Sequence, residues 1–256
     1  MVPITKKWLF TVVAILSLVF FSVPVLAQTA PSVTVQQIGP ENIAEVSAVG
    51  TGTRVDAAQV GRRNSLVLSA NGQDNQIDTD QRGNANGAGL VVTGDTNRVA
   101  LGQRSDGAVN AASLLQNGVG NEIDTLQFAN GLVAGFANSL QASQNGDFNY
   151  AGIEQTATSA DAAMFANVAV INQTGNRNRA TLVQDGINNS AEQEQVGSDN
   201  ISDILQTGDN NSAVHRQIGD GLSLPAGTFG TIGIEQTGGA SIIVEQFGPG
   251  LGPSMP

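Results

Sequence analysis

A glutamine recurs every eleven residues in the second half of the chain. Starting at Gln173, the series continues through Gln184, Gln195, Gln206 and Gln217. A glycine follows each of these glutamines two residues later, and in the first four units an asparagine stands three residues after the glycine. Matching spacing in several columns is the signature of a repeat fold, in which each unit packs against its neighbours.

The first half of the chain keeps the spacing but replaces some of the glutamines. Positions 37, 48, 59, 70, 81, 92 and 103 are eleven apart, and glutamine alternates there with Ala48, Ala70 and Val92. Further units start at Gln116, Gln127, Gln144, Gln155, Gln236 and Gln246. The chain thus contains 18 units, of which 15 begin with glutamine.

Each unit is expected to contain one short strand. In a unit written Q-x-G-x-x-N-x-A-x-L-x, followed by the next Q, the recurring residue types stand at positions 6, 8, 10 and 12. This period of two is that of a β-strand with one buried face. In the unit that starts at Gln173, these inward residues are Asn178, Ala180, Leu182 and Gln184. Glycine at a fixed turn position favours a backbone with positive φ.

One strand and one turn cannot close a coil, whereas two can. The sequence therefore predicts an all-β fold, a β-solenoid of stacked two-strand coils with about 22 residues per coil, built from 11-residue half-repeats. In this amyloid-like arrangement glutamine would lie over glutamine and asparagine over asparagine. Each side-chain amide would then bond the amides above and below it, which would satisfy the buried polar groups.

The expected ladder residues share positions 1 and 6 of the units, and the expected turn residues share position 3. The ladder glutamines are Gln37, Gln59, Gln81, Gln103, Gln116, Gln144, Gln173, Gln184, Gln195, Gln206 and Gln217. The ladder asparagines are Asn42, Asn64, Asn75, Asn97, Asn121, Asn149, Asn178, Asn189, Asn200 and Asn211. The turn glycines are Gly39, Gly61, Gly72, Gly83, Gly94, Gly118, Gly146, Gly175, Gly186, Gly197, Gly208 and Gly219.

The repeat is interrupted in several places. Extra residues follow Gln103, Gln127, Gln155 and Gln217. Because each coil needs only its neighbours, these insertions are expected to leave the solenoid as loops at turns. Three units carry leucine at the asparagine position, namely Leu132, Leu222 and Leu251.

The N-terminal segment has the pattern of a signal peptide. Lys6 and Lys7 precede an almost wholly apolar stretch, 9–25, and the small residue Ala27 ends a pattern that a signal peptidase accepts. We expect residues 1–27 to be a signal peptide and residues 28–36 a short leader. The solenoid is expected over residues 37–248, followed by a Pro/Gly-rich tail, 249–256.

Charge and composition exclude several functions. Without the segment 1–27 and its two lysines, nine arginines oppose 22 acidic residues, a net charge of 9 − 22 = −13. An acidic chain with a single tyrosine and no lysine is not expected to bind nucleic acid. The only histidine, His215, falls at an inward position with no second ligand type near it. We therefore expect no catalytic residue, metal or cofactor, and no enzymatic activity.

The units resemble the curlin repeat of curli fibre subunits. They read QTGNRNRATLVQ at 173–184, QDGINNSAEQEQ at 184–195 and QTGDNNSAVHRQ at 206–217, and the resemblance extends from about Gln37 to Gly248. It implies a secreted structural subunit, major or minor, of a functional amyloid fibre on the bacterial cell surface that serves adhesion and biofilm matrix. It also implies, as partners, other curlin-like subunits and an outer-membrane secretion pore of the curli type.

Uncapped ends favour polymerisation of the chain with itself. The sequence shows neither a helix nor a polar cap beside the first or the last unit, so both ends are expected to offer unpaired strand edges to a second copy. The prolines at 249, 253 and 256 cannot donate to a sheet and would shield the C-terminal end. The alternative is therefore a monomeric β-solenoid, either an adhesin or an ice-binding protein, that does not polymerise.

Overall fold

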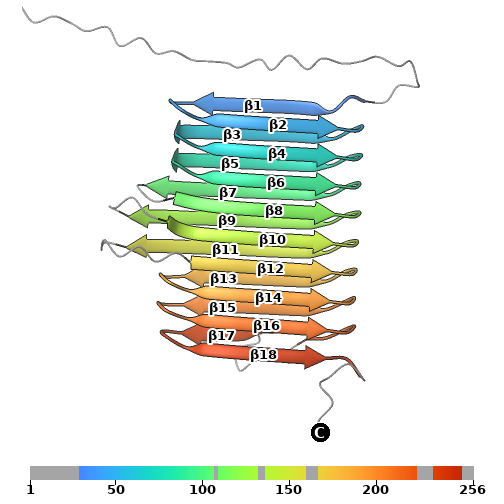
Figure 1. The fold of residues 1–256 in the computed structure, drawn as a ribbon, viewed down its shortest axis with the longest axis vertical. Helices are drawn as coiled ribbons and strands as arrows, with labels where there is room; N and C mark the ends of the chain where they lie inside the picture. Colours follow the sequence, from blue (N-terminus) through green and yellow to red (C-terminus); the bar gives the residue numbers. More distant parts are fainter. Residues whose placement is uncertain (1–28, 107–108, 132–135, 160–166, 224–232, 250–256) are drawn as a thin grey trace, which may run out of the picture.

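The computed structural model describes residues 29–106, 109–131, 136–159, 167–223 and 233–249 of the 256-residue chain. In these ranges the chain consists of β-strands joined by turns, stacked into a rod (Figure 1). This β-solenoid confirms the predicted fold class. None of the described residues belongs to a helix that is long and apolar enough to cross a membrane. The expected signal peptide, 1–27, lies outside the described residues, as do residues 250–256 of the expected tail.

The strands alternate between two parallel sheets of nine strands each. The odd sheet contains β1 (Ser32–Ile38), β3 (Arg54–Arg62), β5 (Gln76–Asn84), β7 (Arg98–Asp106), β9 (Glu122–Gly131), β11 (Tyr150–Ser159), β13 (Arg179–Asp185), β15 (Ile201–Thr207) and β17 (Ile234–Thr237). The even sheet contains β2 (Ile43–Val49), β4 (Ser65–Asn71), β6 (Gly87–Thr93), β8 (Val109–Asn117), β10 (Phe136–Asn145), β12 (Asn167–Thr174), β14 (Ser190–Val196), β16 (Ser212–Ile218) and β18 (Ser241–Phe247). One odd strand and the even strand that follows it form one rung.

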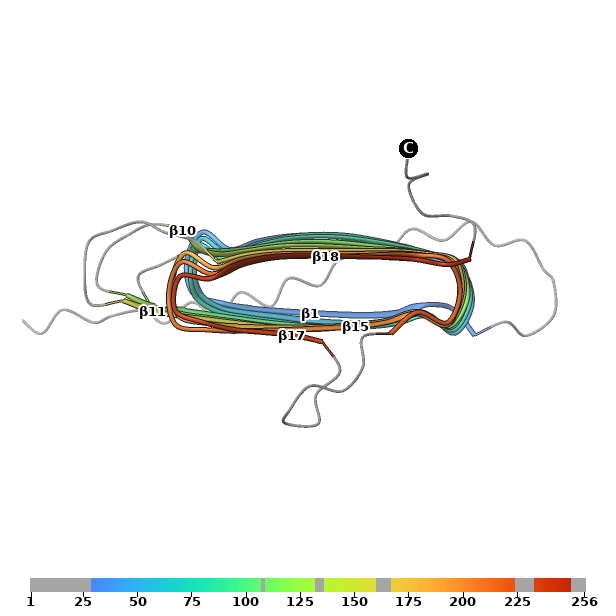
Figure 2. The same cartoon turned by 90° about the horizontal axis from the view of Figure 1, so that it is seen from below.

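The coil is flattened, with the two sheets facing each other across a thin interior (Figure 2). Gln37 pairs with Gln59, and Gln59 with Gln81, a separation of 22 residues that confirms the predicted coil length. The solenoid starts before the expected boundary, because β1 begins at Ser32, inside the segment 28–36 that we expected to be a leader.

The insertions leave the glutamine columns of the coils around them aligned, although the pairing of β10 with β8 shifts register between Phe136 and Asn138. Residues 107–108, 132–135, 160–166 and 224–232, which the structure does not describe, each lie between two successive strands. The separation between paired glutamines rises to 24 and then to 28 residues, yet glutamine still pairs with glutamine. The unit from Gln127 also keeps its asparagine, since Asn138 pairs with Asn110 and Asn167. The expectation that Leu132 replaces this asparagine is therefore wrong.

A large apolar cluster runs through the solenoid from Ala48 to Ile234. Most of its side chains come from positions 8 and 10 of the units, as with Ala180 and Leu182, both fully buried, and Ala48, Ala70 and Val92 add residues from position 12. Burying a leucine or isoleucine side chain contributes about 1.5–3 kcal/mol, so a column of them along the axis is a large driving force for stacking. The outward residues of the same strands are mostly half-buried or exposed, as the period of two predicts.

The turns require glycine at position 3 for two reasons. The backbone of Gly186 has a φ of 127°, and a Cβ there would lie 2.2 Å from the carbonyl oxygen of Gly208 in the next coil. Two residues later, position 5 also adopts a left-handed conformation, as at Asn188 with a φ of 57° and Asp199 with a φ of 61°. Asparagine and aspartate tolerate this conformation better than most residues do. Position 5 was not among the turn positions expected from the sequence.

We expect Gly186→Ala to destabilise the solenoid. The left-handed backbone alone costs a residue with a Cβ about 1–2 kcal/mol, and the contact with the Gly208 carbonyl adds to this cost because it forces the next coil to shift. Gly89→Ala is the matched control, since no atom lies within 4 Å of the new Cβ. Urea unfolding should show a large loss for the first variant and a change within about 0.5 kcal/mol for the second. Equal losses would contradict this role of the turn glycine.

Candidate functional site

A ladder of glutamine side chains follows the odd sheet through all nine of its strands. In each bond, Nε2 of one glutamine donates to Oε1 of the glutamine one coil later, over 2.7–2.9 Å. The ladder consists of Gln37, Gln59, Gln81, Gln103, Gln127, Gln155, Gln184, Gln206 and Gln236. The members from Gln59 to Gln206 are fully buried.

The second amide proton of each ladder glutamine joins the two sheets. Gln184 Nε2 donates to Gln206 Oε1 at 2.9 Å and to the carbonyl oxygen of Val168, in the even sheet, at 3.0 Å. Gln184 Oε1 accepts from Gln155 Nε2 at 2.8 Å. Both donors and the acceptor of this buried amide are therefore satisfied, which removes the cost of burying it.

The matching column of the even sheet is incomplete. Its first three positions are Ala48, Ala70 and Val92, which are apolar. The next six are Gln116, Gln144, Gln173, Gln195, Gln217 and Gln246, joined by five bonds of the same kind. Because Val92 precedes Gln116 and cannot donate, the buried Oε1 of Gln116 has no hydrogen-bond partner among the described residues.

The asparagines combine bonds between neighbouring side-chain amides with bonds to the backbone of the turns. Asn178 Oδ1 accepts the backbone N–H of Asn200, one coil later, at 3.1 Å. Its Nδ2 donates to the carbonyl oxygen of Gly197 at 2.8 Å and also reaches back to Asn149 Oδ1 at 3.1 Å. The expected amide–amide bonds are present, most continuously at one corner of the coil, where Asn64, Asn86, Asn110, Asn138 and Asn167 each donate Nδ2 to the Oδ1 of the asparagine one coil earlier. The bonds to the turn backbone were not expected from the sequence. The reason is geometric: a side chain at the start of a strand lies within reach of the backbone of the next turn.

Two corners contain these asparagines. At the first corner, where an odd strand turns into an even one, the residues are Asn42, Asn64, Asn86, Asn110, Asn138, Asn167, Asn189, Asn211 and Ala240. At the second corner they are Thr53, Asn75, Asn97, Asn121, Asn149, Asn178, Asn200 and Leu222. The expected turn glycines precede these residues, all with positive φ.

Several residues with the same contacts were not among the expected ladder residues. Asn86, Asn110, Asn138 and Asn167 are fully buried at the first corner. The last three follow insertions, so a fixed spacing of eleven misses them, whereas Asn86 keeps the spacing and was identifiable. Four glutamines recognised as unit starts also belong to the ladders, namely Gln127, Gln155, Gln236 and Gln246.

Apart from the ladders and the corners, hydrogen-bonded polar side chains around His215 are buried near the C-terminal end of the interior. His215 is fully buried, with Nδ1 2.7 Å from Ser202 Oγ and Nε2 3.1 Å from Gln246 Oε1. Because Gln246 Oε1 can only accept, Nε2 carries the proton, and Nδ1 accepts from the Ser202 hydroxyl. Gln193 Nε2 donates to Ser202 Oγ at 2.9 Å. Burial lowers the pKa of His215, and the hydrogen bond to Gln246 partly offsets this, so the imidazole is neutral at pH 7.

Some of the outward acidic residues have a structural role. Asp209 Oδ1 accepts the backbone N–H of Ile187, and Asp220 Oδ1 that of Ser198, in each case one coil earlier. These carboxylates cap the turns. Arg177 hydrogen-bonds Asp199 across neighbouring rungs and lowers the pKa of that carboxyl. Such exposed ion pairs contribute little to stability.

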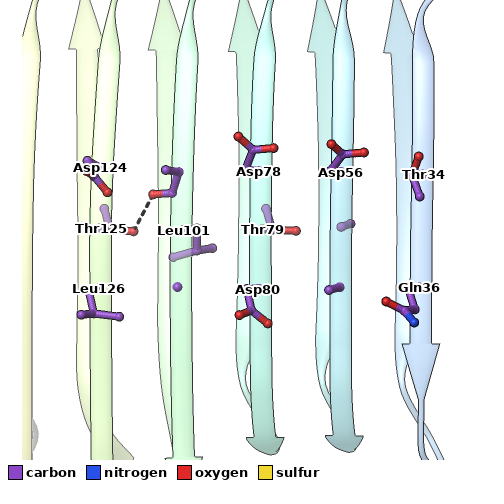
Figure 3. Close-up of a pocket in the computed structure, with 14 residues that line it drawn as sticks. Thr34, Gln36, Asp56, Asp78, Thr79, Asp80, Leu101, Asp124, Thr125 and Leu126 are labelled. Carbon is purple, nitrogen blue, oxygen red and sulfur yellow. Dashed lines mark hydrogen bonds between the residues drawn. The ribbon is translucent and has the colours of Figure 1, made fainter.

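A shallow groove of about 560 Å³ follows the outer face of the odd sheet from β1 to β9 (Figure 3). Its outward carboxylates are those of Asp56, Asp78, Asp80 and Asp124. Arg54 pairs with Asp56 and Arg82 with Asp80, so part of this charge is neutralised. Within the described ranges, no three His, Cys, Asp or Glu side chains are grouped so that they could hold a metal ion.

The two ends of the described rod have open strand edges. β1 and β2 at one end, and β17 and β18 at the other, each have a single hydrogen-bonded neighbour. The inward side chains of the first and last rungs, such as Val35 and Val244, are only half-buried against the core. Among the described residues, nothing pairs with the outer edges of these strands or covers the interior at either end.

Residues 72–104 match the family model described as Curlin associated repeat. This segment runs from the turn after β4 through β5 and β6 into β7. The match confirms the resemblance inferred from the units. No curated protein matches the chain significantly.

We expect Gln184→Ala to destabilise the solenoid. The change leaves Gln155 Nε2, Gln206 Oε1 and the Val168 carbonyl without their partner. Each buried group left unsatisfied costs about 1–3 kcal/mol, so the free energy of unfolding should fall by at least about 2 kcal/mol. Glu192→Gln on an exposed outward position is the control and should change it by less than about 0.5 kcal/mol. Similar losses in urea unfolding would show that the inward amides carry no special role.

The stability of the solenoid should depend on pH through His215, the only histidine of the chain. Its folded-state pKa lies below the ordinary value of 6.5, so the unfolded chain takes up this proton first as the pH falls. The contribution of the neutral imidazole is complete above pH 6.5 and decreases as the pH falls below 6.5.

The substitution His215→Leu removes the titrating group. Leucine already stands at an equivalent inward position, Leu68. Comparing the free energies of unfolding at about pH 7.5 and about pH 5.5 should show a decrease in the wild type that is smaller in the variant. Identical decreases in the two proteins would assign the pH dependence to the carboxylates alone.

Proposed function

Because the chain carries curlin repeats, we propose that it is a secreted structural subunit of a curli-like amyloid fibre, in which solenoids stack end to end. The curlin repeat and the β-solenoid are structural modules, not catalytic ones. Surface adhesion and a role in the biofilm matrix are the uses that the resemblance supports.

The observation that carries this proposal is the openness of both end rungs. A second copy placed beyond β17 and β18 would offer β1 and β2 to them, strands that belong to the same two columns of the same fold. The half-buried Val35 and Val244 would then become part of a continuous core. Strand edges that are exposed and flat are templates for pairing with another chain.

The glutamine ladder fixes the direction of stacking. Every bond runs from Nε2 of one glutamine to Oε1 of a later one, so the last odd-sheet glutamine, Gln236, offers a donor, and the first, Gln37, offers an acceptor. The C-terminal end of one copy therefore suits the N-terminal end of the next. At about 4.8 Å per rung, the ladder of the odd sheet would continue across the junction.

Location and export belong to the same proposal. We propose that residues 1–27 direct export, that a curli-type outer-membrane pore passes the chain, and that the fibre lies outside the bacterial cell. The acidic composition, with 22 acidic residues, supports a role without nucleic acid.

A monomeric ice-binding solenoid is less well supported. The threonines that share position 2 of their units divide between the sheets, with Thr156, Thr207 and Thr237 in the odd sheet and Thr174 in the even sheet. In the odd sheet, Asp185 separates Thr156 from Thr207. The flat ladder of threonines that an ice-binding face requires is therefore not formed by these residues.

The test is to dilute residues 28–256 from denaturant and follow thioflavin fluorescence together with fibre diffraction. We expect fibres with a reflection near 4.7–4.8 Å along the axis. A monomer that stays soluble for days at high concentration, without this reflection, would contradict the proposal. It would leave a monomeric adhesin as the better interpretation.

A further inference from the structure

The junction between two copies of this chain would match on the odd sheet. Gln236 Nε2 would face Gln37 Oε1 of the next copy, continuing the ladder of the odd sheet. At the second corner, Leu222 would face Pro31. Leu222 has no side-chain acceptor, and Pro31 has no backbone N–H that needs one, so this corner leaves no donor unsatisfied.

The same junction would not match in the glutamine column of the even sheet. Gln246 Nε2 donates one proton to the Ser223 carbonyl at 3.0 Å. Within the even-sheet ladder, the second proton of each glutamine goes to the next glutamine, as from Gln217 to Gln246 at 2.8 Å. At the junction, the residue opposite Gln246 would be Ala48, which cannot accept. One amide proton would be buried without a partner.

The first corner would not match either. Along this corner, the asparagine side chain accepts the backbone N–H of the next coil, as Asn189 Oδ1 does for Asn211 at 3.0 Å. The last described residue of the column is Ala240, whose own N–H is bonded to Asn211 Oδ1 at 3.2 Å. Ala240 offers no acceptor, so the backbone N–H of Asn42 in the next copy would be left unsatisfied. Both mismatches lie on the even side.

We infer that the end formed by β17 and β18 is a docking surface for a curlin-repeat chain other than this one. The first even-sheet strand of this partner chain carries glutamine at the position that corresponds to Ala48. At the position that corresponds to Asn42, this partner carries proline. Proline has no backbone N–H and so needs no acceptor, which is also true of Pro31 at the second corner. The chain accordingly copolymerises more readily than it stacks on itself. This inference rests on the proposed fibre function, since it concerns the partner at the fibre junction.

The first test repairs the corner from the C-terminal side. In Ala240→Asn, the new side-chain Oδ1 can accept the backbone N–H of Asn42 in the next copy. The new Nδ2 can donate to the carbonyl of Gly39 in that copy, as Asn42 Nδ2 donates to the carbonyl of Gly61 within the chain. We expect the critical concentration for homopolymer growth to fall about tenfold, since one buried donor gains its partner. Ser241→Asn, at the exposed neighbouring position, is the matched control and should leave it unchanged.

The second test supplies the partner chemistry directly. The variant Ala48→Gln/Ala70→Gln/Val92→Gln makes every residue of the even-sheet column a glutamine. No glutamine in this column then has an apolar neighbour, either at the junction or inside the chain. We expect it to elongate wild-type fibre seeds faster than wild-type chains do, again by about tenfold. Its control is Val49→Gln/Val67→Gln/Val91→Gln, at outward valines that are exposed. If the inward variant does not fold by circular dichroism, Ala240→Asn decides alone.

The outcomes separate this inference from the proposed function. If neither wild type nor variants form fibres, the fibre function fails, and this inference fails with it. If wild-type fibres form and Ala240→Asn shifts the critical concentration no more than Ser241→Asn does, only the inference of a mismatched junction is overturned. Faster growth with the repaired variants supports it.

Discussion

Side-chain amides that find their partners one coil away are the interaction on which this structure depends. A core lined by glutamine and asparagine would ordinarily be unstable, because the free-energy cost of burying an unsatisfied amide exceeds the free energy gained by packing it. Here Gln184 donates to Gln206 and to the Val168 carbonyl while accepting from Gln155. The amide is satisfied only when the coils keep their register, so the ladder makes the register of each rung a condition for burying its polar groups.

The other features follow from this condition. Asparagine at the corners can bond the backbone of the next turn because glycine lets neighbouring turns lie close together; at Gly186 even a Cβ would meet the carbonyl of the next coil. Insertions between strands are tolerated because they leave the columns aligned on both sides. The glutamine bonds all run in one direction, which gives each glutamine ladder a donor end and an acceptor end. A fibre built from the solenoid would inherit that direction, and the composition of the end rungs would decide which neighbour fits.

The sequence was sufficient to predict the fold class and the inward positions, because a period of two inside a period of eleven permits few other arrangements. It was also sufficient to align glutamine with glutamine. It did not reveal that asparagine bonds turn backbone, because that contact depends on how closely two turns approach. Asn110, Asn138 and Asn167 were missed because insertions shift them out of the spacing. The buried group around His215 and Ser202 joins residues of different strands, and their proximity follows from the coil geometry and not from the motif.

Side-chain hydrogen exchange tests the ladder most directly. Gln206 and Gln141 lie in the same protein, but Gln206 is fully buried in the ladder and Gln141 is exposed on an outward position of β10. Amide protons that are buried and hydrogen-bonded exchange only when the structure opens. NMR of the soluble chain, labelled with ¹⁵N, should show the Nε2 protons of Gln206 exchanging orders of magnitude more slowly than those of Gln141. Equal, fast exchange at both side chains would contradict the account, because the amide ladder would then not hold the coils together.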